Sequence, residues 1–539
     1  MTPDIRPKFR IGLLLNGTSI SKYVFDFIKW ILADDHLELK SIIIRSPSSA
    51  TVGFPDACQD DCDYRPTPVA GFLFTLIVMF ERLLLLKNRD HHDHMQKFDL
   101  LLLVPHGIIR AESLDDSPRD GPPDVDLLVV FSSGPLSKGV WESAKLGVIA
   151  LSLSDRRNYR GGPPGFWEVY FRDDVTGFTI ERLRSAPQEN ETLFRGQIAT
   201  QYYYLLNQAS LFQKSTYYLA QLVGRIAASG KLPTRQEELP FSRIPQHNPE
   251  LHHTLHYALG LIGLLISKIL QKLGRDYRWK VAFLPCEWRV AALWRASIIP
   301  NKPGHYLADP FIITQDGRHF CFAEDYDIAQ RRGRIVVYEL KDRQAAYVGI
   351  AIQEDFHLSY PFLFYYDGVL YMCPETSAVR EIRIYRCLEF PLRWTLDKVL
   401  MTGVSAADSM LFERDGRWWM LTNIDPADWG DHAIELHVFS ATNPVSDKWT
   451  PHPGNPFFID AAFARNGGMV REGDRLFRVA QSQGFGMYGK RTTLREIVEL
   501  TDQQYVERQI CVISPQFRRR IFGTHHFHSD GAVTVFDFA

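Results

Sequence analysis

The chain has few cysteines, no excess of basic residues and no uninterrupted apolar run of membrane-spanning length. Its 7 cysteines are scattered and odd in number, which argues against a disulfide framework and favours a reducing compartment. The balance of 61 Lys and Arg against 63 Asp and Glu gives a formal net charge of −2. A protein that follows a phosphate backbone carries a basic excess, so we expect no nucleic-acid partner.

The apolar segments near the start and in the middle of the chain bear on its location. The first, in FRIGLLLNG, is too short for the core of a signal peptide, so we expect a cytoplasmic protein. Two longer stretches, residues 71–87 and 255–273, are interrupted by charge or His before they reach the roughly 18 to 20 apolar residues of a span. They predict amphipathic helices that either pack in the protein or lie peripherally on the inner membrane face.

The first 200 residues alternate short apolar runs with helix-like segments. Examples of the apolar runs are FRIGLLLNG, LELKSIIIRS, DLLVVFSSG and LGVIALS. Continuous apolar runs between helices are typical of strands buried on both faces, so residues 1–200 predict an α/β domain with a parallel sheet. Residues 201–275 have helical periodicity, with Gly230 placed as a stop, and predict a helical connector.

From residue 276 onward one phrase returns five times. Its versions are ADPFIITQDGRHFCFAED, SYPFLFYYDGVLYMCPET, AADSMLFERDGRWWMLTN, NGGMVREGDRLFRVAQS and HHFHSDGAVTVFDF. Each contains a hairpin turn, and a period near 50 residues with about four short strands is typical of a propeller blade rather than of a β-sandwich. Residues 276–539 therefore predict a five-bladed β-propeller, closed by pairing of WKVAFLP with VTVFDFA.

The repeat also predicts where a site lies. The innermost strands of all blades converge at one end of the central channel, so each repeat supplies one or two side chains there. The residues at the matching position before the first strands are Asp309, Tyr360, Asp408 and Asn466, with His526 or His528 in the last blade. Further carboxylates lie at the ends of second strands, namely Glu324, Asp325 and Glu375.

Other side chains of the repeats suit a sugar ligand. His357 and Tyr488 flank two of the phrases, and such rings either stack on sugar rings or belong to the aromatic core. Arg465 and Arg478 present a planar fork that fits a phosphate or carboxylate of a donor, and a blade-stabilising ion pair is the alternative for each.

The run GVIALSLSDRRNYRGGPPGFWEV followed by TGFTIERL resembles the core of the N-terminal domain of the formyltransferases. That resemblance implies an Asn, a His two residues later and a more distant Asp as the groups that position and deprotonate the attacking amine. The matching positions hold Ala150, Ser152 and a residue near Gln188. None of these is a base near neutrality, so we expect a degenerate domain that keeps the fold as a scaffold.

The phrases ADPF, HLSYPFLF, YMCPET and RVAQSQGFGMYG resemble the propeller of the family-43 glycoside hydrolases. More specifically, they resemble the propeller region of the glucosamine inositolphosphorylceramide transferases and of bacterial relatives that join it to a formyltransferase-like domain. The hydrolase resemblance implies a general-base Asp, an Asp that adjusts a pKa and a general-acid Glu, where this chain has Asp309, Tyr360 and Asp408. It also implies a metal near a last-blade His. We predict no cofactor, and leave open a channel ion near His526 or His528.

Together these patterns predict a carbohydrate-active protein of surface-glycan or glycolipid biosynthesis, with glycosyl transfer in the propeller. The predicted partners are a sugar donor and a glycan or glycolipid acceptor, and the oligomeric state stays open. The predicted catalytic residues are Asp309, Asp408 and Glu375. The predicted substrate-binding residues are Glu324, Asp325, His357, Tyr360, Arg465, Asn466, Arg478, Tyr488 and His526. A non-catalytic carbohydrate-binding or assembly protein is the main alternative, and glycoside hydrolysis and sugar N-formyl transfer are weaker ones.

Overall fold

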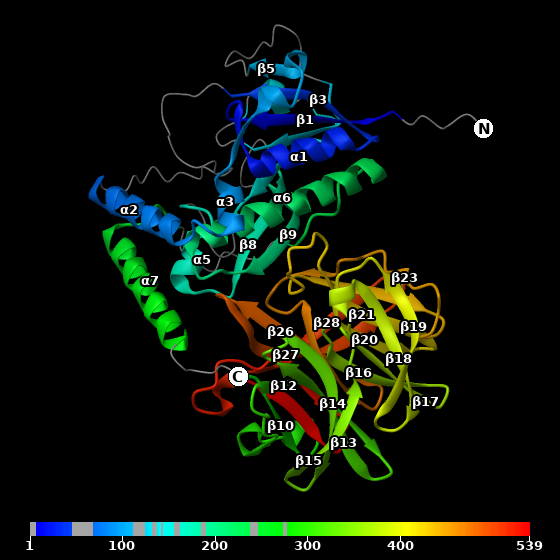
Figure 1. The fold of residues 1–539 in the computed structure, drawn as a ribbon. Helices are drawn as coiled ribbons and strands as arrows, with labels where there is room; N and C mark the ends of the chain where they lie inside the picture. Colours follow the sequence, from blue (N-terminus) through cyan, green and yellow to red (C-terminus); the bar gives the residue numbers. More distant parts are fainter. Residues whose placement is uncertain are drawn as a thin grey trace, which may run out of the picture. The chain divides into compact units, whose positions relative to one another are not determined.

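The chain forms two compact units, Met1–Leu270 and Gln271–Ala539 (Figure 1). The computed structural model describes residues 7–45, 68–111, 124–131, 136, 138–141, 144–155, 162–184, 190–237, 246–272 and 278–539. Among these residues strands predominate and helices are few.

The first unit is built on a seven-stranded sheet in the order β5-β3-β1-β6-β7-β8-β9. The first five of these strands pair in parallel, and β8 and β9 extend the sheet antiparallel. The strands are β1 (Phe9–Leu15), β3 (Leu37–Ile44), β5 (Ile109–Ala111), β6 (Leu127–Val130), β7 (Val148–Ser152), β8 (Val175–Arg182) and β9 (Glu191–Ala199). A separate pair consists of β2 (Ser19–Ser21) and β4 (Lys97–Asp99). Every residue of β6 and β7 is buried, as expected of central strands covered on both faces.

Helices of very different length accompany this sheet. They are α1 (Lys22–Ala33), α2 (Pro68–Leu84), α3 (Arg89–Met95), α4 (Lys138–Trp141), α5 (Phe166–Phe171), α6 (Tyr204–Ser229) and α7 (Leu251–Lys272). The long helix α6 packs against β8 and β9 and ends at Gly230, whose left-handed φ of 66° is the conformation glycine favours at a helix end. Residues 201–275, expected to form a connector, therefore contribute most of their helical residues to the first unit. No helix of the described residues is long and apolar enough to cross a membrane.

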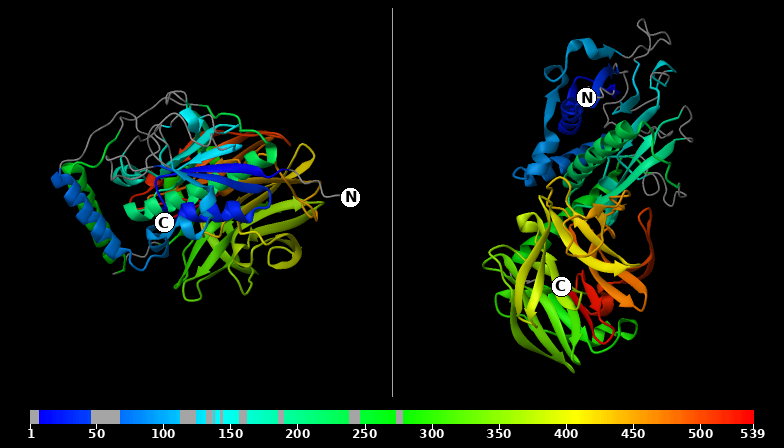
Figure 2. Two further views of the ribbon diagram at one scale, coloured as in Figure 1. Left: turned by 90° about the horizontal axis from the view of Figure 1, so that it is seen from above. Right: turned by 90° about the vertical axis from the view of Figure 1, so that its right-hand side faces the viewer.

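The second unit is a propeller of five blades, each antiparallel within itself, and the fourth and fifth are joined in one eight-stranded sheet by a parallel strand pair (Figures 1 and 2). The first two blades are β12 (His305–Gln315), β13 (Arg318–Asp327), β14 (Arg332–Lys341) and β15 (Gln344–Ile352), then β16 (Ser359–Tyr366), β17 (Val369–Glu375), β18 (Glu381–Glu389) and β19 (Arg393–Thr402). The third contains β20 (Ala406–Arg414), β21 (Arg417–Ile424), β22 (Glu435–Ala441) and β23 (Thr450–Pro451), with β24 (Phe458–Ile459) paired to β22. The fourth contains β25 (Arg465–Glu472), β26 (Arg475–Gly484), β27 (Met487–Leu500) and β28 (Tyr505–Ile513).

The fifth blade is assembled from both ends of the second unit. It contains β29 (Phe527–Ser529), β30 (Thr534–Phe538), β10 (Lys280–Leu284) and β11 (Ser297–Ile298). β10 pairs antiparallel with β30, which confirms the predicted closure of the ring by WKVAFLP and VTVFDFA. The innermost strands β12, β16, β20, β25 and β29 contact one another in succession, and β29 contacts β12 again. The five repeated phrases are therefore the inner hairpins of five blades.

The backbone conformation of the inner hairpin turns explains why the dipeptide Asp-Gly recurs in the repeat. In the first three blades both central residues of the inner hairpin turn have positive φ, for example 51° at Asp316 and 71° at Gly317. A two-residue turn with positive φ at both positions favours Asp-Gly, because glycine has no Cβ and Asp tolerates the left-handed region.

Candidate functional site

A β-bulge interrupts the innermost strand of four blades at the same place. The register shifts lie between Ala308 and Phe311, Ser359 and Phe362, Ala407 and Met410, and Asn466 and Met469. In the first three blades the first bulged residue, Asp309, Tyr360 or Asp408, has a left-handed φ of 49°, 48° or 51°. Such a conformation costs about 1–3 kcal/mol in a residue with a Cβ and concentrates at functional sites. Its repetition around the ring marks this end of the channel as the candidate site.

The fourth blade departs from the predicted alignment. Its bulge holds Gly467 and Gly468, so Asn466 lies one residue before the position that Asp309 and Asp408 occupy. Asn466 is fully buried, and its amide donates a hydrogen bond of 2.9 Å to the carbonyl oxygen of Asp408. A Cβ on Gly467 would lie 2.3 Å from the carbonyl oxygen of His525. The fourth blade therefore contributes close backbone packing at this position, where we had predicted a side chain.

His525 bridges two buried carboxylates beside the first bulge. Its Nε2 lies 3.1 Å from Oδ1 of Asp309, and its Nδ1 lies 3.0 Å from Oδ1 of Asp537. Asp537 also accepts the backbone N–H groups of Asp309, His525 and His526. Burial opposes the charge on His525, but the two carboxylates raise its pKa to about 10. Burial would likewise raise the pKa of Asp309, yet the hydrogen bond and charge of His525 lower it to about 2. Both groups are therefore ionised near neutral pH.

Glu324 lies close to Asp309, but Glu324 keeps its proton whereas Asp309 is ionised. Burial raises the pKa of Glu324 well above its ordinary value, and the negative charges of Asp309 and Glu375 raise it further. His357 places its Nε2 3.7 Å from a carboxyl oxygen of Glu324, while its Nδ1 accepts the N–H of Gly333 at 2.8 Å. Burial also lowers the pKa of His357, so the ring is neutral and Glu324 holds its own proton.

The third bulge brings a second carboxyl group of raised pKa to the cluster. Asp408 accepts hydrogen bonds from Nε of Arg465 at 2.6 Å and from the amide of Gln481 at 3.2 Å. Burial raises the pKa of Asp408 to about 7, although the Arg465 guanidinium opposes that shift. Arg465 also lies 3.8 Å from Glu375, which accepts a 2.7 Å hydrogen bond from the hydroxyl of Ser377. One arginine therefore joins two of the three predicted catalytic residues.

Aromatic rings complete the site. The ring of Tyr488 lies 5.1 Å from that of His525. The guanidinium of Arg465 lies over the Tyr488 ring, 5.2 Å from its centre. Tyr488 is 45% exposed, so it presents an aromatic surface beside buried charges. The ring of Trp279 lies 4.0 Å from that of His525. Tyr360 is buried, and its hydroxyl accepts the N–H of Gly468 at 2.9 Å, which ties the second blade to the fourth.

Two predicted binding residues lie in other surroundings, and a third lies beside the cluster without joining its ion pairs. Asp325 pairs with Arg334 at 2.9 Å and with His305 at 3.1 Å. Arg478 is fully buried and forms a forked ion pair with Glu507, so the geometry favours the structural alternative for this arginine. His526 is fully buried against Phe311, with its Nδ1 3.8 Å from Oδ1 of Asp309, and burial lowers its pKa to about 4.

Two residues of the site were missed in the sequence, His525 and Asp537. The histidine precedes β29, and the pattern of that strand pointed to its neighbours His526 and His528. Asp537 is a lone carboxylate in the apolar run VTVFDFA, and a charged residue in a buried strand needs a partner. That signal, taken alone, could have found it.

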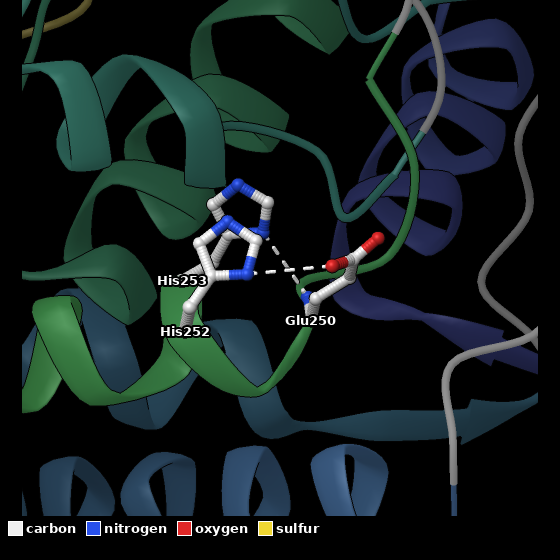
Figure 3. A group of neighbouring side chains, drawn as sticks. All are labelled: Glu250, His252 and His253. Atoms are coloured by element: carbon white, nitrogen blue, oxygen red, sulfur yellow. Dashed lines mark hydrogen bonds and ion pairs between the residues drawn. The ribbon is translucent and has the colours of Figure 1, made fainter.

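Two groups among the described residues have ligand atoms within 4.8 Å of one another, as a metal site requires. They are Asp309, His525 and Asp537 in the propeller, and Glu250, His252 and His253 at the start of α7 (Figure 3). In the first group each ring nitrogen of His525 faces a carboxylate oxygen, as expected of an imidazolium between two anions. A channel ion near His526 or His528 stays a prediction.

The second group is explained by the start of the helix. Nδ1 of His253 accepts the backbone N–H of Glu250 at 3.3 Å, so the lone pair of that nitrogen is already used. Nδ1 of His252 lies 3.3 Å from the Glu250 carboxylate, and its ring lies 3.7 Å from that of His253 (Figure 3). These contacts fix the first turn of α7 without a metal ion.

Comparison with known proteins points to the same part of the chain. Residues 288–528 match the family model described as glucosamine inositolphosphorylceramide transferase 1, N-terminal. The chain is 37% identical over 215 residues to glucosamine inositolphosphorylceramide transferase 1 of Oryza sativa subsp. japonica, covering 38% of this chain and 28% of that protein. The protein of the same name from Arabidopsis thaliana is 32% identical over 213 residues, covering 39% and 28%. The chain thus spans less than a third of the length of these relatives.

Solved structures similar to the chain include glycoside hydrolases. A family 117 glycoside hydrolase of Zobellia galactanivorans is 10% identical with a TM-score of 0.35, covering 49% of this chain and 92% of its own. The catalytic domain of a family 62 α-L-arabinofuranosidase of Coprinopsis cinerea is 10% identical with a TM-score of 0.34, covering 48% and 85%. The five blades are defined here by strand pairing and by the contacts of the inner strands.

The first unit has no comparable support as a formyltransferase-like domain. The family match begins at residue 288, beyond that unit, so the resemblance stays a prediction. Ala150 and Ser152, the positions expected to have lost catalytic groups, lie on β7 and are buried. The position near Gln188 lies outside the described residues.

Proposed function

We propose that the propeller catalyses glycosyl transfer from an activated sugar donor to a glycan or glycolipid acceptor. The observation that carries the proposal is the unequal protonation of neighbouring carboxyl groups. Asp309 is held ionised with a pKa of about 2. Burial instead raises the pKa of Glu324 well above its ordinary value and that of Asp408 to about 7, so both keep a proton at a pH where Asp309 has lost its own. Pairs of carboxyl groups whose pKa values are pushed apart are what glycosidic chemistry uses. The names of the relatives support a glycolipid acceptor.

We assign Asp309 the role of stabilising the positive charge that develops at the anomeric carbon of the donor sugar. A carboxylate with a pKa of about 2 is a poor proton acceptor near neutrality, so removal of a proton does not suit it. Its fixed negative charge suits the positive charge that develops on the sugar as the bond to the leaving group breaks and the electron pair departs with that group. His525 keeps this charge in place through its ion pair with Asp309.

We assign Asp408 the role of general base, which takes the proton from the acceptor hydroxyl. A pKa of about 7 matches a general base that works near neutral pH, because both protonation states are then populated. As the acceptor oxygen bonds to the anomeric carbon, its proton passes to Asp408. Glu324, which holds its proton, is the group that can protonate a leaving group. Arg465 and Glu375 are assigned to substrate positioning, and the exposed ring of Tyr488 to stacking on a sugar.

The test uses the full chain and the variant Asp309→Asn. A panel of nucleotide sugars is offered with glycolipid acceptors, and transfer is measured beside release of free sugar. We expect transfer by the wild type and a loss of at least about a thousandfold in the variant, roughly 4 kcal/mol of transition-state stabilisation. Thermal shift with the same sugars should change little, because the loss concerns charge in the transition state.

Asp325→Asn is the matched control. Asp325 is a buried carboxylate of the same blade, but it pairs with Arg334 and His305 outside the cluster. This variant should lose stability without a comparable loss of turnover per folded molecule. Equal transfer by the wild type and Asp309→Asn would contradict the proposal, and release of free sugar without transfer would indicate a hydrolase.

A non-catalytic carbohydrate-binding protein is the second candidate. The ion pair of 2.6 Å between Arg465 and Asp408 favours it, because that contact occupies the assigned base. Tyr360 also fills a bulged position that holds a carboxylate in the blades on either side. This candidate predicts sugar binding by the wild type with no transfer or release from any donor, and unchanged binding in Asp309→Asn.

A further inference from the structure

Two helices of the first unit expose apolar stripes along one side. On α2 the exposed residues recur at steps of three and four, as on one helix face: Val69, Phe72, Leu76, Met79 and Leu83. On α7 they do the same: Leu251, Leu255, Leu259, Ile262 and Ile266. The exposed fractions reach 67% at Phe72 and 68% at Leu259. Soluble proteins rarely leave contiguous apolar surface of this kind uncovered.

Helix α2 is unusual in what it buries. Of its 17 residues the fully buried ones are Ala70 and Glu81, although most of the helix is apolar. A helix inside a protein buries its apolar face and exposes its polar one, whereas α2 directs its one carboxylate inward. The orientation is therefore the reverse of that of an ordinary surface helix.

Glu81 is the group that fixes this orientation. Its two carboxylate oxygens accept the backbone N–H groups of Tyr204 and Leu205 at the start of α6, each at 3.0 Å. One of them also accepts the hydroxyl of Tyr257 from α7 at 2.5 Å. A single carboxylate thus joins three helices, and α2 and α7 lie next to each other on one side of the first unit (Figures 1 and 2). We call the exposed apolar residues of the two helices, taken together, the α2–α7 surface.

The two helices carry more basic than acidic side chains, and the nearest solvent-accessible carboxylates in the sequence, Asp90 and Glu250, lie just beyond their ends. Residues 68–89 contain one carboxylate, the buried Glu81, and residues 251–272 contain none. Arg82, Lys87 and Arg89 are exposed at the end of α2 and in the residues that follow it. Anionic lipid headgroups complement such a rim, and apolar side chains flanked by Lys and Arg are typical of helices that lie in a membrane interface.

We propose that the α2–α7 surface binds an anionic lipid bilayer, with both helices lying in the plane of the interface. No described helix is long and apolar enough to cross a membrane, so the contact would be peripheral. The proposal does not rest on glycosyl transfer, although a bilayer is where a lipid-linked acceptor resides.

The test is co-sedimentation of the full chain with vesicles. One set contains phosphatidylcholine alone, and the other contains equal parts of phosphatidylcholine and phosphatidylglycerol. We expect binding to the anionic set and binding at least about tenfold weaker to the neutral one. The double variant Leu83→Glu with Leu259→Glu should weaken anionic binding by a further tenfold or more, because both side chains are 65% or more exposed and would enter the bilayer.

Two further variants separate the contributions. Leu388→Glu, at a 53% exposed leucine of the propeller, should bind vesicles as the wild type does. Arg82→Gln with Lys87→Gln should remove most of the preference for anionic vesicles and leave weak binding to both sets. The proposal is overturned by absence of vesicle binding. It is overturned equally by a concentration-dependent dimer, seen in sedimentation velocity, that the Leu83 and Leu259 double variant abolishes. Neither result depends on transfer activity, so the two proposals fail separately.

Discussion

The propeller contains two buried clusters of charge that look alike in composition and differ in balance. In the fourth blade Arg478 and Glu507 are both fully buried, and Arg495 adds a second contact to Glu507 at 2.7 Å. At the channel end, the described residues place two cations, Arg465 and His525, among five carboxyl groups: Asp309, Glu324, Glu375, Asp408 and Asp537. The first cluster has two arginines for one carboxylate, and the second has more carboxyl groups than cations to pair them.

The difference appears in the protonation of the carboxyl groups. Burial would raise the pKa of Glu507, but Arg478 and Arg495 lower it below its ordinary value, so one ionised state is fixed. In the channel cluster burial keeps a proton on Glu324, whereas His525 keeps Asp309 ionised in spite of burial. A buried ion pair is therefore weak support for function, whereas carboxyl groups held in different states mark a site that can move charge.

The largest effect is expected from Glu507→Gln. The substitution leaves the guanidinium of Arg478 buried without a counter-charge, which typically costs about 3–5 kcal/mol. Denaturant unfolding of the full chain, followed by tryptophan fluorescence, measures the loss. Glu339→Gln is the control, because Glu339 pairs with Arg318 at the surface and such pairs contribute about 0–1 kcal/mol. Equal losses in the two variants would show that the fourth-blade cluster is not the structural one.

A smaller effect with a distinct pH dependence is expected from His525→Gln. Its raised pKa of about 10 means that the imidazolium contributes stability that is fully present below pH 6.5 and is lost as the pH rises through 10. We expect a loss of about 2 kcal/mol near neutral pH that shrinks toward pH 10. The pKa of Asp309 should also rise, because its bridging cation is gone. Unfolding measured across this pH range tests the charge on His525, and unfolding at acid pH tests the shift of Asp309. A loss independent of pH between 6.5 and 10 would contradict the assigned charge of His525.

The sequence predicted the architecture of the propeller better than the contents of its site. The Asp-Gly turns and the near-constant period predicted five blades, since a hairpin turn depends on its own two residues. The bulges place Asp309, Tyr360 and Asp408 at equivalent positions, as the repeat predicted. Asn466 was misplaced by one residue because the glycines of its bulge have no side chain to align.

What the sequence could not separate were residues whose surroundings depend on the packing of distant strands. Arg465 and Arg478 belong to neighbouring strands of one blade, yet only Arg465 meets carboxylates of the second and third blades. The role of His525 depends on Asp309 and Asp537, which are 228 residues apart in the chain. No local pattern encodes contacts of that range, and the predicted catalytic roles themselves await the transfer assay.

The smallest effect on stability is expected from Glu324→Gln. This variant is also the sharpest test of the difference between the channel cluster and the fourth-blade cluster. Because burial raises its pKa well above the ordinary value, Glu324 is already neutral, and an amide replaces it with no loss of charge. The folding free energy near pH 4, below the ordinary Glu pKa of about 4.3, should change by less than about 1 kcal/mol, against the loss expected for the same substitution at Glu507. The stability that the raised pKa represents is present at low pH and is lost as the pH rises through the folded-state pKa. Wild type should therefore weaken relative to Glu324→Gln as the pH rises from about 4 toward the raised pKa of the folded state. Unfolding of both proteins over a series of pH values upward from about pH 4 measures this difference. A large loss near pH 4 would instead mean that Glu324 is ionised, as Glu507 is in the fourth blade.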